Sequence, residues 1–102
     1  MVKHLVMWRL AATGDAERAA AVEEIRAMLE GLPAAVPGVR SLEVGVNGLP
    51  GDKASDIVVT TSFDGWTALR DYGSHPEHVK VAARIAELTS ERRSVDYELE
   101  SR

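Results

Sequence analysis

The residues best suited to acid and base chemistry lie together in the segment 71–78, which reads Asp-Tyr-Gly-Ser-His-Pro-Glu-His. This segment places a phenol, Tyr72, close in sequence to two imidazoles, His75 and His78. Imidazole is the commonest general base, and a phenol can donate a hydrogen bond to a carbonyl oxygen that gains charge as a proton is removed. Such a pair could remove a proton from a carbon beside a carbonyl, with His78 as base and Tyr72 as donor.

A helix is needed to position His78. Ser74 and Glu77 have the spacing of a capping box, and Pro76 suits the first helical turn. The apolar residues of 82–88 continue at helical spacing from His78, which predicts that the imidazole lies on the buried face of this helix. A buried titratable group needs a partner, so the sequence must supply one elsewhere.

Metal binding is a second interpretation of the histidines, because His75 and His78 can approach one ion from the start of a helix. However, the chain has no cysteine, and the pair lacks the i, i+4 spacing of helical zinc motifs. The glycines of 45–51 form a loop and not a phosphate cradle, because no helix start follows them. We therefore predict neither a metal nor a cofactor.

Composition narrows the class of protein further. A chain of 102 residues suits one domain spanning 1–102, and the absence of cysteine is compatible with a reducing, cytoplasmic environment. The net charge of −4 comes from intermixed charges, and only Arg92 and Arg93 form a basic pair, which we interpret as solvated side chains. No apolar run approaches the roughly 20 residues of a membrane span. We expect no nucleic-acid or membrane partner.

Hydrophobic periodicity predicts alternating strands and helices. Strands are expected over 2–10, 41–46, 57–63 and 93–99, and helices over 15–32, 64–73 and 75–90. This order indicates an α+β fold, a ferredoxin-like βαββαβ subunit with a four-stranded antiparallel sheet. The helices can cover only one sheet face while the strands are apolar on both, so we expect a homodimer with two sheets face to face.

Four segments together resemble the stress-responsive dimeric α/β-barrel family. They are Val2–Val6, Pro37–Gly45, Tyr72–His78 and Val95–Tyr97. Taken in order, they extend over nearly the whole chain. The resemblance implies a dimeric barrel. Most members of this family are known only as stress-responsive, whereas plant polyketide cyclases of the family perform an aldol condensation with a tyrosine and a histidine base at the places of Tyr72 and His78.

The resemblance also implies a role for Asp96, since those cyclases have an aspartate at its place. Strand alternation agrees, because Asp96 lies on the strand face opposite to Val95 and Tyr97, which would face a dimer partner. We expect Asp96 to orient His78. In the structural interpretation, which stays open, His78 is a core histidine satisfied by Asp96, and Tyr72 only packs its ring.

The sequence favours binding of a small, mostly apolar or aromatic metabolite in a cavity between sheet and helices. The expected polar groups are Tyr72, His78 and Asp96, and the other expected ligand-binding residues are His4, Val6, Trp8, Val59, Leu69 and Ile85. The alternatives are the cyclase-like or isomerase-like enzyme, a structural stress-related dimer without ligand, and a haem-binding or monooxygenase-like barrel.

Overall fold

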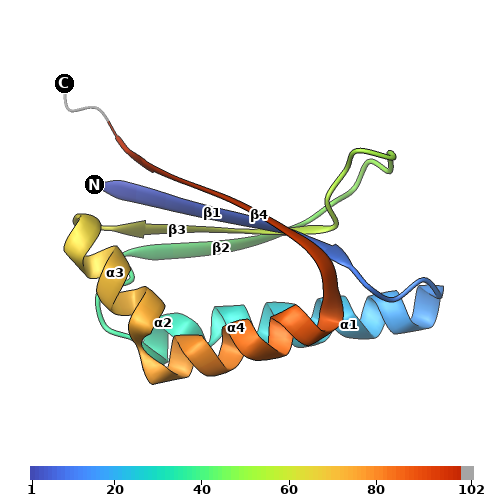
Figure 1. Ribbon diagram of the computed structural model, residues 1–102, viewed down its shortest axis with the longest axis horizontal. Helices are drawn as coiled ribbons and strands as arrows, with labels where there is room; N and C mark the ends of the chain where they lie inside the picture. The colour runs from blue at the N-terminus through green and yellow to red at the C-terminus, as the bar shows by residue number, and fades with distance from the viewer. Residues whose placement is uncertain (100–102) are drawn as a thin grey trace.

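Four strands form one sheet, and the helices pack against one of its faces, in the computed structural model of this protein, which describes residues 1–99 (Figure 1). The elements are β1 (Val2–Leu10), α1 (Asp15–Glu30), α2 (Leu32–Ala35), β2 (Ser41–Val46), β3 (Ile57–Phe63), α3 (Trp66–Ser74), α4 (Pro76–Leu88) and β4 (Thr89–Glu98). Neighbouring strands are antiparallel, and their order across the sheet is β2-β3-β1-β4. The predicted ferredoxin-like βαββαβ arrangement is thereby confirmed.

Asp15 and Asp64 are expected as the N-caps of α1 and α3 from their residue type, but the structure places each cap one residue away. The cap of α1 is Gly14, and Asp15 is the first residue of the helix. Gly65 takes the cap position of α3, because the carboxylate of the predicted cap, Asp64, binds the guanidinium of Arg40 at 2.8 Å. Of the helices within residues 1–99, none has the length and apolar composition to span a bilayer.

The start of β4 was also misplaced by the sequence prediction. This strand begins at Thr89 and not at Arg93, and its early residues pair with the end of β1, with Arg92 opposite Trp8 and Thr89 opposite Leu10. The segment before Arg93 is polar and has no apolar alternation, so the prediction extended the preceding helix to residue 90. However, a strand at the edge of a sheet can be held by backbone pairing while it carries charged side chains.

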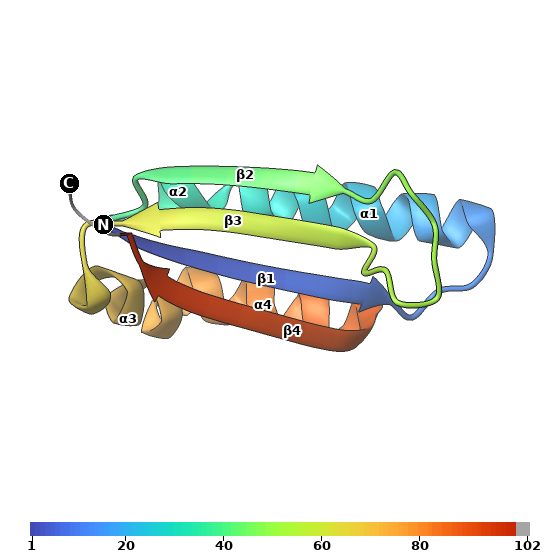
Figure 2. The same cartoon turned by 90° about the horizontal axis from the view of Figure 1, so that it is seen from above.

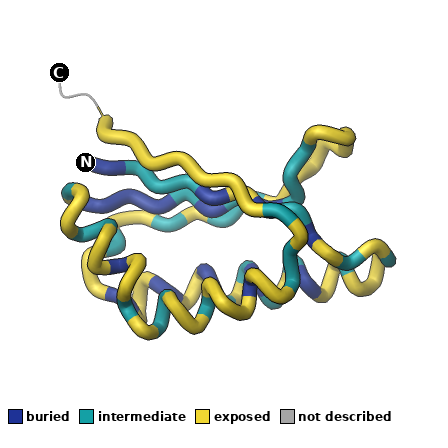
Figure 3. Tube along the Cα trace, viewed as in Figure 1, coloured by how far each residue is buried: buried dark blue, intermediate teal, exposed yellow. Residues whose placement is uncertain are grey.

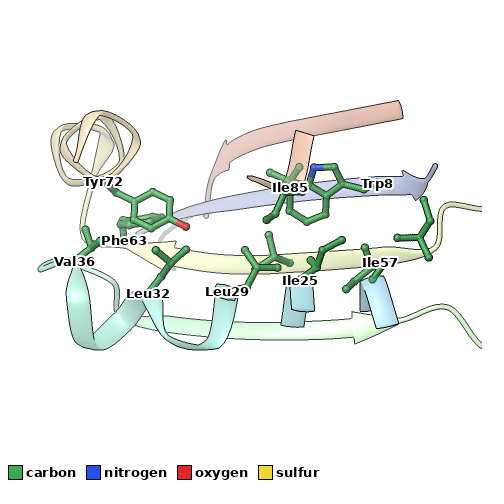
Figure 4. Close-up of a cluster of buried hydrophobic side chains, with 13 residues drawn as sticks. Trp8, Ile25, Leu29, Leu32, Val36, Ile57, Phe63, Tyr72 and Ile85 are labelled. Atoms are coloured by element: carbon green, nitrogen blue, oxygen red, sulfur yellow. The ribbon is translucent and has the colours of Figure 1, made fainter. Parts of the chain in front are cut away.

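Alternate residues of the central strands make the core. On β1 the residues that face the helices are almost all buried, and the opposite residues of β3 share that face. Figure 3 shows buried residues along β1 and β3, whereas β4 is mostly exposed. The largest fully buried side chains are those of Phe63, Ile25, Leu32, Ile57 and Ile85. Figure 4 shows this core between sheet and helices, with Tyr72 and Trp8 near its two ends.

The other face of the sheet has no helix over it, as Figure 2 shows. The strand register places Leu5, Met7, Val58 and Val95 together on this open face, with Tyr97 beside them. Met7, Val95 and Tyr97 are exposed. The open face therefore exposes apolar side chains, as the sequence predicts, beside charged ones such as Lys3 and Arg93.

Candidate functional site

A cavity of about 300 Å³ lies between the sheet and α4. Its walls include five of the six predicted ligand-binding residues, His4, Val6, Trp8, Val59 and Ile85. The predicted catalytic residues Tyr72 and His78 also line it. Leu69, the sixth, packs against the hydrophobic core and does not line the cavity. The segment 71–78 and the apolar strand faces therefore meet at one place.

The helix that carries His78 begins differently from the predicted capping box. The cap of α4 is His75, whose Nδ1 accepts a hydrogen bond from the backbone N–H of Glu77 at 3.1 Å. The hydroxyl of Ser74 instead donates to the carbonyl oxygens of Arg70 and Asp71, at 3.2 and 3.3 Å, in the last turn of α3. His75 thus satisfies a free N–H group at the helix start.

His78 lies one turn into α4, where a backbone hydrogen bond defines its protonation. Its Nδ1 is 3.1 Å from the carbonyl oxygen of Gly73. A carbonyl oxygen only accepts, so Nδ1 must carry the proton, and Nε2 of the neutral ring keeps its lone pair. Burial lowers the pKa of His78; the Gly73 hydrogen bond opposes this shift, and the charges of His4 and Arg92 add to it. The imidazole is therefore neutral at pH 7 and can act as a base.

Tyr72 supplies the complementary group. Tyr72 is only 2% exposed. Its ring centroid lies 4.4 Å from that of His78, 5.0 Å from that of Phe63 and 6.2 Å from that of His4. Burial raises the pKa of Tyr72 to about 12. The phenol therefore stays protonated at physiological pH and remains a hydrogen-bond donor beside a neutral base.

The predicted pairing of Asp96 with His78 is wrong. The carboxylate of Asp96 instead binds Nδ1 of His4, which lies directly opposite it in the β1–β4 register. The face of Asp96 was correctly predicted, since His4 belongs to the helix-facing side of β1, but Asp96 does not line the cavity. Asp96 orients His4, and the Gly73 carbonyl takes the role that we expected of Asp96 toward His78.

Some cavity residues were missed by the sequence analysis. Ala82 and Ala86 line the cavity from α4, and the helical spacing of 78, 82 and 86 is the signal that could have identified them. Arg92 lines the cavity as well, and it is an exposed residue, as the sequence suggested. Its position opposite Trp8 places it on the helix-facing side of β4.

The geometry around the histidines gives no support to a metal site. Across residues 1–99, no group of three or more His, Cys, Asp or Glu side chains is arranged to hold a metal ion. His75 uses its Nδ1 as the cap of α4, and His78 uses its Nδ1 on Gly73. The two nitrogens have separate structural partners.

Solved structures similar to this chain share its whole length. A dimeric protein of unknown function with a ferredoxin-like fold, from Bacteroides fragilis NCTC 9343, is 33% identical with a TM-score of 0.86, covering 96% of this chain and 95% of that one. A dimeric ferredoxin-like protein of unknown function from Thermobifida fusca is 28% identical with a TM-score of 0.82, covering 96% and 90%. The hydroxynitrile lyase from Passiflora edulis shares the fold at 13% identity, with a TM-score of 0.82 and coverage of 99% and 94%.

The family comparison agrees with the fold and with the resemblance seen in the sequence. No curated protein matches this sequence. Residues 2–99 match the family described as the stress responsive A/B barrel domain. Because this match spans nearly all of the chain, the protein belongs to the stress responsive A/B barrel domain family.

Proposed function

We propose that this protein binds a small, mostly apolar metabolite in the cavity between its sheet and α4. The observation that carries this proposal is the cavity itself, whose volume of about 300 Å³ has an apolar wall that includes Val6, Val59 and Ile85. Tyr72 and His78 add convergent polar groups at one place in this wall. Concave apolar sites with a few polar groups are the usual form of small-molecule sites.

Filling the cavity from α4 is expected to weaken this binding. Ala82 lines the cavity and Ala83 next to it does not, so Ala82→Leu adds volume inside the site while Ala83→Leu adds the same volume outside it. Calorimetric titration with benzylacetone, an apolar aromatic ketone, should show binding to the wild type and to Ala83→Leu, and binding at least about tenfold weaker to Ala82→Leu. Failure of the wild type to bind benzylacetone or related aromatic carbonyl compounds would contradict the proposal.

A second candidate function is proton transfer within the bound ligand. The specific observation in its favour is the pairing of a neutral, oriented His78 with a protonated Tyr72 at a ring distance of 4.4 Å. His78 Nε2 would take a proton from a carbon beside a carbonyl, and the electron pair of that bond would move onto the carbonyl oxygen. Tyr72 would donate a hydrogen bond to this oxygen, and return of the proton elsewhere completes an isomerisation or precedes a cyclisation.

The remaining alternatives have less support. A structural dimer without ligand would be favoured by side chains that fill the space beside His78, whereas this space is an open cavity. Across residues 1–99 we find no feature that favours haem over an apolar metabolite. We include a cytoplasmic location in the proposal, because a sequence without cysteine is compatible with a reducing compartment.

We further propose that the open face of the sheet pairs with a second copy of this chain. Its exposed apolar side chains include Met7, Val95 and Tyr97, and the Bacteroides fragilis relative is described as dimeric. A stable interface needs about 800 Å² from each partner, and burying these side chains favours such a contact.

A charge on the open face is expected to separate the dimer. Val95 is 51% exposed on the open face, and Val79 is 52% exposed on α4, so Val95→Glu and Val79→Glu are matched changes on different surfaces. Sedimentation equilibrium should give twice the 11.1 kDa chain mass for the wild type and Val79→Glu, and the chain mass for Val95→Glu. A wild-type protein that sediments as a monomer at micromolar concentration would contradict the dimer.

A further inference from the structure

The cavity wall includes a cationic residue, Arg92, which comes from β4, whereas Tyr72 and His78 come from α3 and α4. Arg92 lines the cavity and lies opposite Trp8 in the strand register, on the helix-facing side of β4. The positive charge of Arg92 contributes to lowering the pKa of His78. Arg92 is an exposed residue of the cavity wall, so a ligand can reach its guanidinium.

The other charges beside the cavity already have partners. The carboxylate of Asp96 binds His4, and that of Glu91 binds Arg93 at 2.9 Å. Within residues 1–99 Arg92 forms no ion pair, and its side chain has one weak contact, from Nη1 to the hydroxyl of Ser94 at 3.5 Å. The charge left uncompensated at this cavity is positive, although the whole chain has a net charge of −4.

We propose that the ligand of this cavity is an organic acid, with its apolar body between the sheet and α4 and its carboxylate bound by Arg92. This inference rests on the proposed function, because it names the ligand class of the same cavity. A planar guanidinium can donate two parallel hydrogen bonds to a carboxylate, and such charge-assisted bonds are stronger than neutral ones. An apolar molecule without an acid group would leave this donor set unused.

The arrangement also gives the ligand a direction. His4 and Trp8 are separated by four residues of β1, which is about 13 Å at the rise of an antiparallel strand. Tyr72 and His78 lie at the His4 end, and Arg92 is opposite Trp8. An acid held by Arg92 therefore directs the far end of its apolar body toward His78.

A pair of ligands that differ only in the acid group tests the proposal. Hydrocinnamate has a phenyl ring on a short chain that ends in a carboxylate, and hydrocinnamamide replaces this carboxylate with a neutral amide. We would titrate both compounds at pH 7 into the wild type, Arg92→Gln and Arg70→Gln. Arg70 is the matched control, because it is an exposed arginine of α3 that does not line the cavity.

The expected result is that the wild type binds the acid at least about tenfold more tightly than the amide. This preference should disappear in Arg92→Gln and persist in Arg70→Gln. Equal binding of acid and amide by the wild type, or a preference that survives in Arg92→Gln, would overturn the inference. The proposed function would still stand in that case, provided that benzylacetone binds; failure of all three compounds to bind would reject both.

Folding of the variants is checked by their thermal unfolding and by their binding of benzylacetone, which has no carboxylate. Arg92→Lys gives a second test, because it keeps the charge and loses the planar pair of donors. We expect Arg92→Lys to retain part of the preference for the acid. A full preference for the acid in both Arg92→Lys and Arg92→Gln would contradict any role of this side chain.

Discussion

Replacing His78 by alanine is expected to slow exchange of deuterium into benzylacetone by about 10²- to 10⁴-fold, the usual contribution of a positioned base. Benzylacetone carries hydrogens on carbons beside its carbonyl group, and a base at Nε2 of His78 would remove them in the bound state. Proton NMR in D₂O follows the loss of these signals directly. The assay requires no knowledge of the natural substrate, because it measures only proton removal.

His75→Ala is the matched control for this experiment. His75 is a histidine three residues away, but its ring accepts the N–H of Glu77 and does not line the cavity. Loss of this cap should cost about 0.5–2 kcal/mol of stability and leave the exchange rate of the folded protein unchanged. Equal exchange rates in wild type and His78→Ala, with benzylacetone still bound, would show that the protein binds this ketone without catalysis.

The pH dependence of exchange follows from the lowered pKa of His78. The base form is complete above the ordinary value of 6.5 and is lost only as pH falls through the lowered pKa. We therefore expect the rate constant for enzyme-bound exchange to be constant near pH 7 and to decline on the acidic side of 6.5. The same shift makes this histidine stabilise the fold above pH 6.5 and progressively less as pH falls, because the unfolded chain then binds more protons.

Replacing Phe63 by alanine is expected to lower the free energy of unfolding by about 3–5 kcal/mol, the largest stability effect that we predict. Phe63 is 0% exposed at the end of β3, and its ring packs against that of Tyr72 on α3. Truncation removes the transfer free energy of the ring and leaves a cavity where β3 and α3 meet. Urea unfolding followed by circular dichroism measures the difference.

Trp66→Ala provides the comparison for Phe63→Ala. Trp66 is also a large aromatic residue, but it is 40% exposed at the start of α3, so its removal should cost much less. All variants must be compared at one protomer concentration, because association adds to the apparent stability of a dimer. A loss in Phe63→Ala no greater than in Trp66→Ala would contradict the assignment of Phe63 to the core.

The sequence predicts the elements of this fold better than their ends. Hydrophobic periodicity extends over many residues, so the strands and the longer helices can be identified from it. Helix caps depend on single side chains that have several possible partners. Asp64 looks like a cap in sequence, but Arg40 binds its carboxylate, and His75 takes the position that Ser74 and Glu77 were expected to define.

In the candidate site, the sequence predicts which face of a strand a residue occupies but not which residue lies opposite it. Alternation along β4 predicts that Asp96 faces the helices, because side chains of a strand alternate between faces. It does not predict the register between β1 and β4, and this register decides that Asp96 meets His4 and not His78. Arg92 was missed for a related reason, since a charged residue at the start of an edge strand has no apolar pattern around it to reveal the face it occupies.

The pairing of the first strand with the last has a consequence for how the site comes into being. His4 and Asp96 are separated by 92 positions in the sequence, and the backbone of Leu99 donates to the carbonyl of Met1 at 2.9 Å. Contacts between such distant residues form late and slowly, because a long loop must close before they can stabilise anything. During synthesis on the ribosome, Tyr72 and His78 are therefore added to the chain before Arg92. The cavity gains its β4 wall and the cation of Arg92 only when β4 has been synthesised and has paired with β1.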